Sequence, residues 1–298
     1  MIRFDFTTPN DDKKISVVEW GEVDNPKEVI QISHGMAEHA MRYDGFAKQM
    51  NKNGYVVFAD DHRAHGHTDL KTLGYAKGNI FKDTLADLGA LTEFYKNKNN
   101  LPVIFFGHSY GSFLGQRYVQ EYAHLISGAI IGGSSYMGTP LSLAGLAVAN
   151  IACAFGFAKK EGTLLKKLTF DNYNKMFEVG SFISSKKSEC DRYDADELCG
   201  FICSYNFYKS FFKGLREIYK KDNMQKLDKG LNVLLISGKC DPVGEMSKGV
   251  VRLEKEYKEY GVNVKTVLYD GVRHEYLNDI SRKKAIGDIV NFANSIIK

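Results

Sequence analysis

Short, continuous apolar runs are the feature that most constrains the fold of this chain. The runs that we predict as strands are Ile15–Trp20, Val29–Ser33, Tyr55–Ala59, Val103–Phe106, Ala129–Ile131, Val233–Ser237 and Val264–Tyr269. Most of the later runs do not alternate with polar residues, which is typical of strands buried on both faces of a parallel sheet. Stretches with helical periodicity separate them, such as residues 85–95 and 286–297. Alternating strands and helices predict an α/β fold.

The segment 136–212 interrupts this alternation. It is helix-like and rich in Lys, Phe and Tyr, and it has none of the buried-strand runs. A long connection within a compact domain is usually functional. We therefore predict a single α/β domain over residues 1–298, with an inserted helical cap at about 136–212.

One stretch, Gly132–Ala158, carries no charged residue and is long enough to cross a bilayer. Glycine, serine, proline and asparagine residues interrupt it, and this composition disfavours a membrane span. We predict instead the end of a strand followed by an apolar helix from about Leu141 to Phe157. A transient contact of the cap with a membrane surface stays open at this point, as does the oligomeric state.

The overall composition is that of an ordinary globular protein. The net charge is +4 with both signs well mixed, and no block of Lys and Arg predicts nucleic-acid binding. The odd number of scattered cysteines, five, indicates reduced thiols rather than a disulfide framework. The first residues lack the basic start and apolar core of a signal peptide. We therefore expect a cytoplasmic protein.

A Gly-x-Ser-x-Gly pentapeptide, Gly107–Gly111, directly follows the apolar run Val103–Phe106. At a strand-to-helix turn, this pattern holds the serine in a strained backbone that exposes its hydroxyl as a nucleophile. The glycines are needed because side chains there would collide with the strand and the helix. The pentapeptide alone arises by chance in some chains, so its context decides its meaning.

A serine nucleophile needs a general base, and the base needs an orienting carboxylate. Asp241 lies in the turn after the Val233–Ser237 run, and His274 lies in the loop after Val264–Tyr269. Loops at the carboxyl ends of parallel strands share one edge of the sheet, so these residues can converge with Ser109. The chain order Ser, Asp, His is the order expected for this architecture. We predict Ser109, Asp241 and His274 as the catalytic residues.

Two alternatives apply to the acidic residue. Asp241 could be a helix N-cap, since Pro242 suits a first helical position. Asp270 is the nearest competitor for the acidic role, but it lies only four residues before His274.

Acyl transfer also requires donors for the oxyanion of the transition state. The backbone N–H of Tyr110 follows the nucleophile directly. The loop His34–His39 follows an early strand, and its His-Gly pair lets the backbone turn close to the site. We predict the backbone N–H groups of Met36 and Tyr110 as the oxyanion hole.

These motifs give the chain a family resemblance. The segments His34–His39, Phe58–Thr68 and Gly107–Gly111, with the loops at Asp241 and at His274–Glu275, carry it. The chain resembles the monoacylglycerol lipase and lysophospholipase-like branch of the α/β-hydrolase superfamily, whose domains are of the serine aminopeptidase S33 type. The resemblance implies an α/β-hydrolase fold, cleavage of acyl esters through an acyl-serine intermediate, and an apolar acyl tunnel beneath a cap.

The chain departs from the family in two places. Members often have a second glycine where Ala64 stands, in the turn formed by residues 63–67. The cap is the least family-like part, so the resemblance says least about the substrate there.

A cluster of polar side chains at His62, His65, His67 and Asp69 raises the question of a metal site. His65–Asp69 matches the His-x-His-x-Asp pattern of metallo-β-lactamase-like hydrolases, but that family has a histidine where this chain has Leu70. Downstream histidines are too few to complete the ligand set, and Cys199 and Cys203 lack a second pair for zinc. We predict no metal, and we expect these polar side chains to brace the oxyanion loop.

The sequence therefore predicts a serine ester hydrolase that needs no metal or organic cofactor. Its predicted substrate is a small acyl ester, such as a monoacylglycerol or a lysophospholipid. A thioesterase, an acyltransferase or a peptidase on the same triad stays open. So does a ligand-binding protein that keeps the fold without the reaction.

Overall fold

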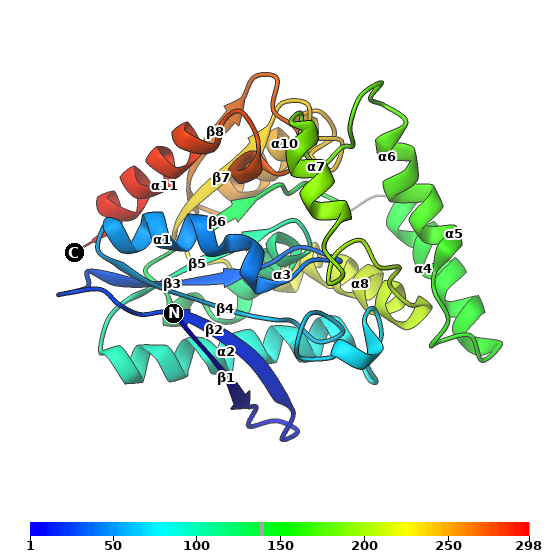
Figure 1. The fold of residues 1–298 in the computed structure, drawn as a ribbon, viewed down its shortest axis with the longest axis horizontal. Helices are drawn as coiled ribbons and strands as arrows, with labels where there is room; N and C mark the ends of the chain where they lie inside the picture. Colours follow the sequence, from blue (N-terminus) through cyan, green and yellow to red (C-terminus); the bar gives the residue numbers. More distant parts are fainter. Residues whose placement is uncertain (138–139, 298) are drawn as a thin grey trace.

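A mostly parallel sheet forms the centre of the molecule (Figure 1). The computed structural model describes residues 1–137 and 140–297. The sheet has eight strands in the order β1-β2-β4-β3-β5-β6-β7-β8. Their bounds are β1 Ile2–Thr7, β2 Lys14–Trp20, β3 Glu28–Ser33, β4 Tyr55–Asp60, β5 Val103–His108, β6 Gly128–Gly132, β7 Asn232–Gly238 and β8 Asn263–Tyr269. The first two pairings, β1 with β2 and β2 with β4, are antiparallel, and the others are parallel.

The apolar runs form strands of this sheet, as predicted, but the last of them is not buried on both faces: β8 lies at an edge, and Tyr269 is its one buried residue. Every residue of β3, β4, β5 and β6 is buried, because helices cover both faces. The sequence analysis missed one strand, β1. Its residues are exposed or half-buried, and it pairs along one edge of the sheet with β2 only.

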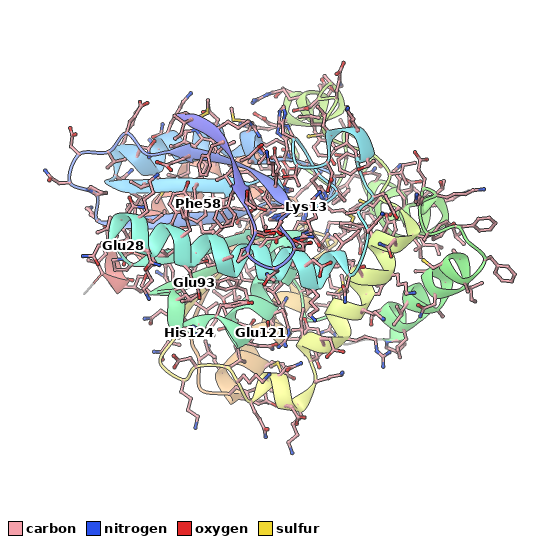
Figure 2. The ribbon with its side chains drawn as sticks, turned by 90° about the horizontal axis from the view of Figure 1, so that it is seen from below. Lys13, Glu28, Phe58, Glu93, Glu121 and His124 are labelled. Carbon is pink, nitrogen blue, oxygen red and sulfur yellow. The ribbon has the colours of Figure 1, made fainter. Side chains whose placement is uncertain are left out.

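Helices cover the two faces of the sheet in different sets. On one face lie α1 (Asp44–Lys52) and α11 (Arg282–Ile296), which share an apolar cluster with the strands. On the other lie α2 (Ile80–Asn99), α3 (Tyr110–Glu121) and α10 (Lys248–Glu259). Figure 2 views the molecule from the side of α2. There the ring of Phe58 on β4 stacks on Tyr95 of α2, with 3.6 Å between the ring centroids, and holds this helix to the sheet.

Between β6 and β7 the chain leaves the sheet and forms a group of helices. Their bounds are α4 Pro140–Ala154, α5 Thr163–Lys166, α6 Asn172–Asn174, α7 Lys187–Asp194, α8 Tyr205–Ile218 and α9 Lys221–Met224. The strongly amphipathic α8 continues past residue 212 and packs against α2 and α3 of the core as well as against α4. In Figure 1, α4, α5 and α6 lie at the end of the molecule far from α11.

The charge-free stretch Gly132–Ala158 forms the end of β6 and then α4. The helix predicted over about Leu141–Phe157 is thus observed, with residues 138 and 139 of the stretch outside the described residues. Across the described ranges, no helix combines the length and the apolar character needed to cross a bilayer.

The start of α3 lies in close contact with the backbones of β5 and β3 at the pentapeptide. A Cβ atom on Gly107 would overlap with the carbonyl oxygen of Gly111, and one on Gly111 would overlap with the carbonyl oxygen of Ser33 on β3. Both positions therefore require glycine. The atoms that a Cβ would meet belong to the backbone, which cannot move away as a flexible side chain could.

We expect Gly111→Ala to destabilise the fold by about 1–3 kcal/mol or more, because the new methyl group has to displace the β3 backbone. Gly287 provides a matched control. It lies within α11, and a Cβ there meets nothing within 4 Å. Gly287→Ala should instead stabilise the protein by about 0.5–1 kcal/mol through helix propensity. Chemical denaturation of both variants checks this, and similar midpoints would contradict it.

Candidate active site

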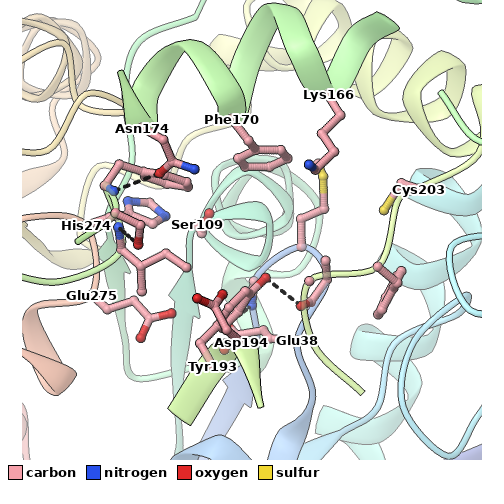
Figure 3. Close-up of a pocket in the computed structure, with 18 of the residues that line it drawn as sticks. Glu38, Ser109, Lys166, Phe170, Asn174, Tyr193, Asp194, Cys203, His274 and Glu275 are labelled. Carbon is pink, nitrogen blue, oxygen red and sulfur yellow. Dashed lines mark hydrogen bonds between the residues drawn. The ribbon is translucent and has the colours of Figure 1, made fainter. Parts of the chain in front are cut away.

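Ser109 lies in the turn between β5 and α3 with a strained backbone. Its φ is 52° and its ψ is −118°, a conformation that non-glycine residues rarely adopt. The surrounding hydrogen bonds hold it there: its N–H donates to the carbonyl of Gly132 at 3.0 Å, and its own carbonyl accepts the Ser112 hydroxyl at 2.6 Å. The side chain is left at the carboxyl edge of the sheet, where it lines a cavity (Figure 3).

His274 and Asp241 form a buried pair at the same edge. The imidazole Nδ1 lies 2.9 Å from the Asp241 Oδ2. Asp241 is completely buried, and its carboxylate also accepts the Val243 N–H at 2.9 Å and the Ser237 hydroxyl at 3.2 Å. A carboxylate held by several donors has little freedom to rotate. It therefore fixes the histidine ring with Nδ1–H toward Asp241, which leaves Nε2 free to act as a base.

The environment of His274 favours its protonated form. Burial alone would lower the pKa of this imidazole. The charge of Asp241, the hydrogen bond to it, and the charges of Glu275 and Glu38 outweigh burial, so the pKa lies above its ordinary value. His274 lines the same cavity as Ser109, and both face its interior in Figure 3. The predicted convergence of the three residues at one sheet edge is thus observed.

Asp270, the alternative to Asp241 as the acidic residue, does not contact His274 and lies at the surface. Its side chain is 86% exposed and pairs with the Lys239 ammonium at 2.8 Å. Asp241 also stabilises its own turn through the Val243 N–H. The sequence also allowed Asp241 to cap a helix through such a contact. In the structure the contact lies in a turn, because the next helix, α10, begins only at Lys248.

The predicted oxyanion loop passes close to the nucleophile. A Cβ atom on Gly35 would lie 3.2 Å from the Ser109 Cβ, so the backbone approaches the serine as the His-Gly pair predicts. Met36 lines the cavity beside Ser109. Within the described part of the chain, the backbone N–H groups of Met36 and Tyr110 donate no hydrogen bond. Tyr110 is the first residue of α3, where the helix dipole favours a negative charge.

Buried histidines brace this loop through the backbone. His65 Nε2 accepts the Ala37 N–H at 3.1 Å, and His34 Nε2 accepts the His62 N–H at 3.0 Å. Burial and the nearby His62 lower the pKa of His34 to about 4, so the ring stays neutral and can accept. The brace that the sequence predicted is therefore present in part: the His65 side chain bonds the loop, while His62 contributes its backbone N–H. His67 is exposed. Asp69 pairs with Lys13 at 2.7 Å and accepts the Ala64 N–H at 2.8 Å, so it holds the histidine turn and not the oxyanion loop.

One other group of possible metal ligands occurs in the described residues. Ligand atoms of His39, Asp196 and Cys199 lie within 4.8 Å of one another. The His39 Nε2 already lies 2.9 Å from an Asp196 oxygen. Burial raises the pKa of the Cys199 thiol far above its ordinary value, although Arg42 opposes this. A protonated thiol beside a guanidinium is a poor ligand for a cation, so we do not interpret this group as a metal centre.

Sequence reasoning missed an ion-pair network next to the site. The Arg42 guanidinium bonds both oxygens of Glu275, at 2.6 and 2.8 Å, and Glu38 at 2.7 Å. Glu38 and Arg42 stand four residues apart, a spacing that could have suggested the pair. Glu275 lies 233 residues further along the chain, and nothing in the sequence links it to Arg42.

Two compartments meet at Ser109 and Met36. One is apolar, and its lining includes Phe113, Val148, Leu165, Leu168, Phe211 and Phe212. The other, the polar compartment, is more polar than the first but mixed. Its lining includes Glu38, Lys166, Asp171, Asn174, Asp194 and Glu275 beside apolar side chains such as Phe170, Phe182 and Ile183. In Figure 3, Lys166, Phe170 and Asn174 reach into the cavity from the helices above Ser109, while Tyr193 and Asp194 lie on the opposite side. The site thus has separate places for an apolar and a polar group on either side of one hydroxyl.

This fold and this arrangement of a serine, a histidine and an aspartate define a serine hydrolase with the α/β-hydrolase fold. The sequence agrees. A profile of the family described as "Serine aminopeptidase, S33" matches residues 24–281, and the chain belongs to this family.

Similar proteins include lipases and esterases. Monoglyceride lipase of Mus musculus is 25% identical over 256 residues, which cover 86% of this chain and 78% of that one. Monoglyceride lipase of Homo sapiens is 26% identical over 258 residues, with the same coverage. The crystal structure of a thermostable carboxyl esterase from Bacillus coagulans in complex with glycerol has a TM-score of 0.88 and 25% identity, covering 100% of this chain and 99% of that one.

We expect Asp241→Asn to slow the reaction of Ser109 with a fluorophosphonate by on the order of 10²–10⁴-fold, because an amide no longer fixes the histidine tautomer or stabilises the imidazolium. Asp270→Asn is the matched control, and its labelling rate should stay within about twofold of the parent because this side chain is exposed. Time courses of labelling measure both. If labelling were slow in Asp270→Asn and normal in Asp241→Asn, the orienting acid would be Asp270 and not Asp241.

Proposed function

We propose that this enzyme hydrolyses the ester bond of monoacylglycerols, with Ser109 as nucleophile, His274 as general base and Asp241 as its orienting acid. The observation that carries this proposal is the pair of compartments that meet at Ser109. An ester carbonyl placed at the serine hydroxyl would direct its acyl chain into the apolar compartment and its alcohol into the polar one. The similarity to monoglyceride lipases supports the same substrate class.

The proposed reaction has two halves. His274 Nε2 takes the proton of the Ser109 hydroxyl as the oxygen attacks the ester carbonyl, and the N–H groups of Met36 and Tyr110 bind the oxyanion. The imidazolium, stabilised by Asp241, returns the proton to the leaving alcohol, and the acyl group remains on the serine. Water then attacks the acyl-serine with the same base, which releases the fatty acid and restores the hydroxyl.

The charges of the polar compartment favour a neutral alcohol over a phosphate. Its acidic side chains are Glu38, Asp171, Asp194 and Glu275. Lys166 is the cationic side chain that lines it, and its ammonium pairs with Asp171 at 3.1 Å. Arg42, behind the lining, pairs with Glu38 and Glu275, so the four carboxylates and two cations leave a formal charge of −2. An anionic head group would meet this negative charge, whereas a hydroxyl of glycerol could donate to the Asp194 carboxylate, which also lines the compartment. We therefore infer that a monoacylglycerol fits this site better than a lysophospholipid.

We expect Ser109→Ala to lower kcat/KM for a monoacylglycerol by about 10³-fold or more, because no other group supplies the nucleophile. Ser295→Ala is the control. Ser295 is exposed, and its hydroxyl bonds only within α11. The assay compares 1-acylglycerols with their 3-phosphates, p-nitrophenyl esters of graded length, an acyl-CoA and a peptide anilide. Equal turnover by Ser109→Ala and the parent would refute the proposal, and preference for the phosphates, the thioester or the anilide would refute the substrate class.

We further propose that the cap docks on a lipid surface. Exposed apolar side chains gather along α4 and the segment that follows it, namely Leu143, Ile151, Phe155, Phe157, Leu164, Leu168, Met176 and Val179. Lys159, Lys160 and Lys167 are exposed among them and suit anionic lipid head groups. The same segment lines the apolar compartment through Val148, Leu165 and Leu168. An acyl chain could therefore pass from a lipid layer into the site with little exposure to water.

We expect Ile151→Ser/Phe155→Ser to weaken binding to anionic phosphatidylglycerol vesicles by about tenfold or more, because two large apolar side chains no longer enter the lipid. Hydrolysis of a water-soluble butyrate ester should not change. Val251→Ser is the control, since Val251 is 51% exposed on α10, outside this segment. Vesicle co-sedimentation measures the partition, and equal partition of the double variant and the parent would contradict docking by this surface.

A reducing compartment such as the cytoplasm is the proposed location. The five cysteines are unpaired, and three of them, Cys190, Cys199 and Cys203, are buried. This arrangement supports a protein that functions without disulfides.

A further inference from the structure

We propose that Arg42 is a positioning residue that holds the oxyanion loop and the loop of the general base together and sets the net charge around that base. This inference rests on the proposed function, because it assigns Arg42 a role in the same site. Arg42 does not line the cavity at Ser109, so it acts through its partners.

Arg42 joins two loops that are far apart in the sequence. Its guanidinium bonds Glu275 with two parallel hydrogen bonds, at 2.6 and 2.8 Å, and Glu38 with a third at 2.7 Å. The side chains are 10%, 8% and 4% exposed for Arg42, Glu275 and Glu38. Bidentate bonds between buried charges fix geometry more strictly than surface ion pairs do.

Glu38 transmits this restraint to the oxyanion loop. Its Oε1 accepts the Gly35 N–H at 2.5 Å and the Tyr43 hydroxyl at 2.9 Å, while its Oε2 accepts from Arg42. Gly35 immediately precedes Met36, whose N–H is the proposed oxyanion donor. A rotation of the Glu38 carboxylate would therefore turn the peptide that leads into this donor.

Glu275 transmits the restraint to the general base, since it directly follows His274. The opposite side of this loop is fixed by the cap: the N–H groups of His274 and Glu275 donate to the carbonyls of Phe182 at 3.1 Å and Ile183 at 2.8 Å. Arg42 also reaches the cap. It lies 4.8 Å over the ring of Tyr193, whose hydroxyl donates to the Ala37 carbonyl at 2.8 Å.

The same network sets the electrostatic environment of the base. Two carboxylates and one guanidinium give a formal charge of −1 − 1 + 1, or −1, beside His274. Asp241 faces the ring from the β7 turn. His108 faces it from β5, and burial with the nearby His274 lowers the pKa of His108 to about 4, which keeps that ring neutral. The nearby phenols are neutral too, because burial raises the pKa values of Tyr43 and Tyr276.

Two variants that change this charge should shift the pKa of His274 in opposite directions. Arg42→Met leaves −2 beside His274, which stabilises the imidazolium and raises its pKa. Glu275→Gln leaves 0, which lowers the pKa. The double variant returns to −1. His274 acts as a base only when neutral, so kcat/KM falls as pH falls through this pKa.

The experiment is the pH profile of kcat/KM for a water-soluble butyrate ester. The acid limb of this profile is the pH range in which kcat/KM falls as His274 becomes protonated. We expect it to move up by about 0.5–1 pH unit in Arg42→Met and down by a similar amount in Glu275→Gln. The double variant should have its limb near that of the parent. Arg42→Lys keeps the charge without the bidentate geometry, so its limb should stay in place while kcat falls by about 10–100-fold. Arg192→Met is the control, since Arg192 pairs with Glu189 at the surface and is 74% exposed.

The results separate this inference from the proposed function. A parent enzyme that does not hydrolyse esters overturns the proposed function itself. An active parent whose limb does not move in Arg42→Met and Glu275→Gln, or moves the same way in both, overturns the role of Arg42. If Arg42→Met does not fold, as thermal unfolding would show, Arg42→Lys and Glu275→Gln still decide the question.

Discussion

The contact between the backbones of β5 and α3 is the constraint on which the rest of the site depends. Because Gly107 and Gly111 have no side chains, α3 can lie against β5 and β3 at the turn where Ser109 has a positive φ. This conformation places the hydroxyl at the carboxyl edge of the sheet and leaves the N–H of Tyr110 at the start of a helix. The loops after β3, β7 and β8 end at the same edge because these strands are parallel to β5 or to its neighbours.

Buried polar groups then fix these loops. Neutral His65 and His34 accept backbone N–H groups, and charged Glu38, Arg42 and Glu275 link the oxyanion loop to the loop of the base. Burying ion pairs seldom adds stability, because the loss of hydration offsets the attraction between the charges. These ion pairs instead fix the geometry of the site. The donors and the base are oriented before a substrate arrives, which is the condition for stabilising a transition state.

The sequence predicted the sheet well, because strands buried on both faces leave continuous apolar runs. It missed β1, where only Ile2, Phe4 and Phe6 alternate with polar residues and the strand lies at an exposed edge. The residues proposed for catalysis could be chosen because each follows a strand. Arg42 could not be, because its contact with Glu275 depends on how two distant loops fold. Likewise, the composition of the cap predicts helices, but which side chains reach the cavity depends on tertiary packing.

The two hydrogen bonds from His274 and Glu275 to Phe182 and Ile183 bear on how the base is held. Through these bonds, the loop of the base and residues 182–183 of the cap are held together. Moving residues 182–183 away from the core would break both bonds, at about 1 kcal/mol each. The base would then be held by Asp241 and by the pair of Glu275 with Arg42 alone. The insertion that lines the cavity therefore also contributes to the alignment of the base.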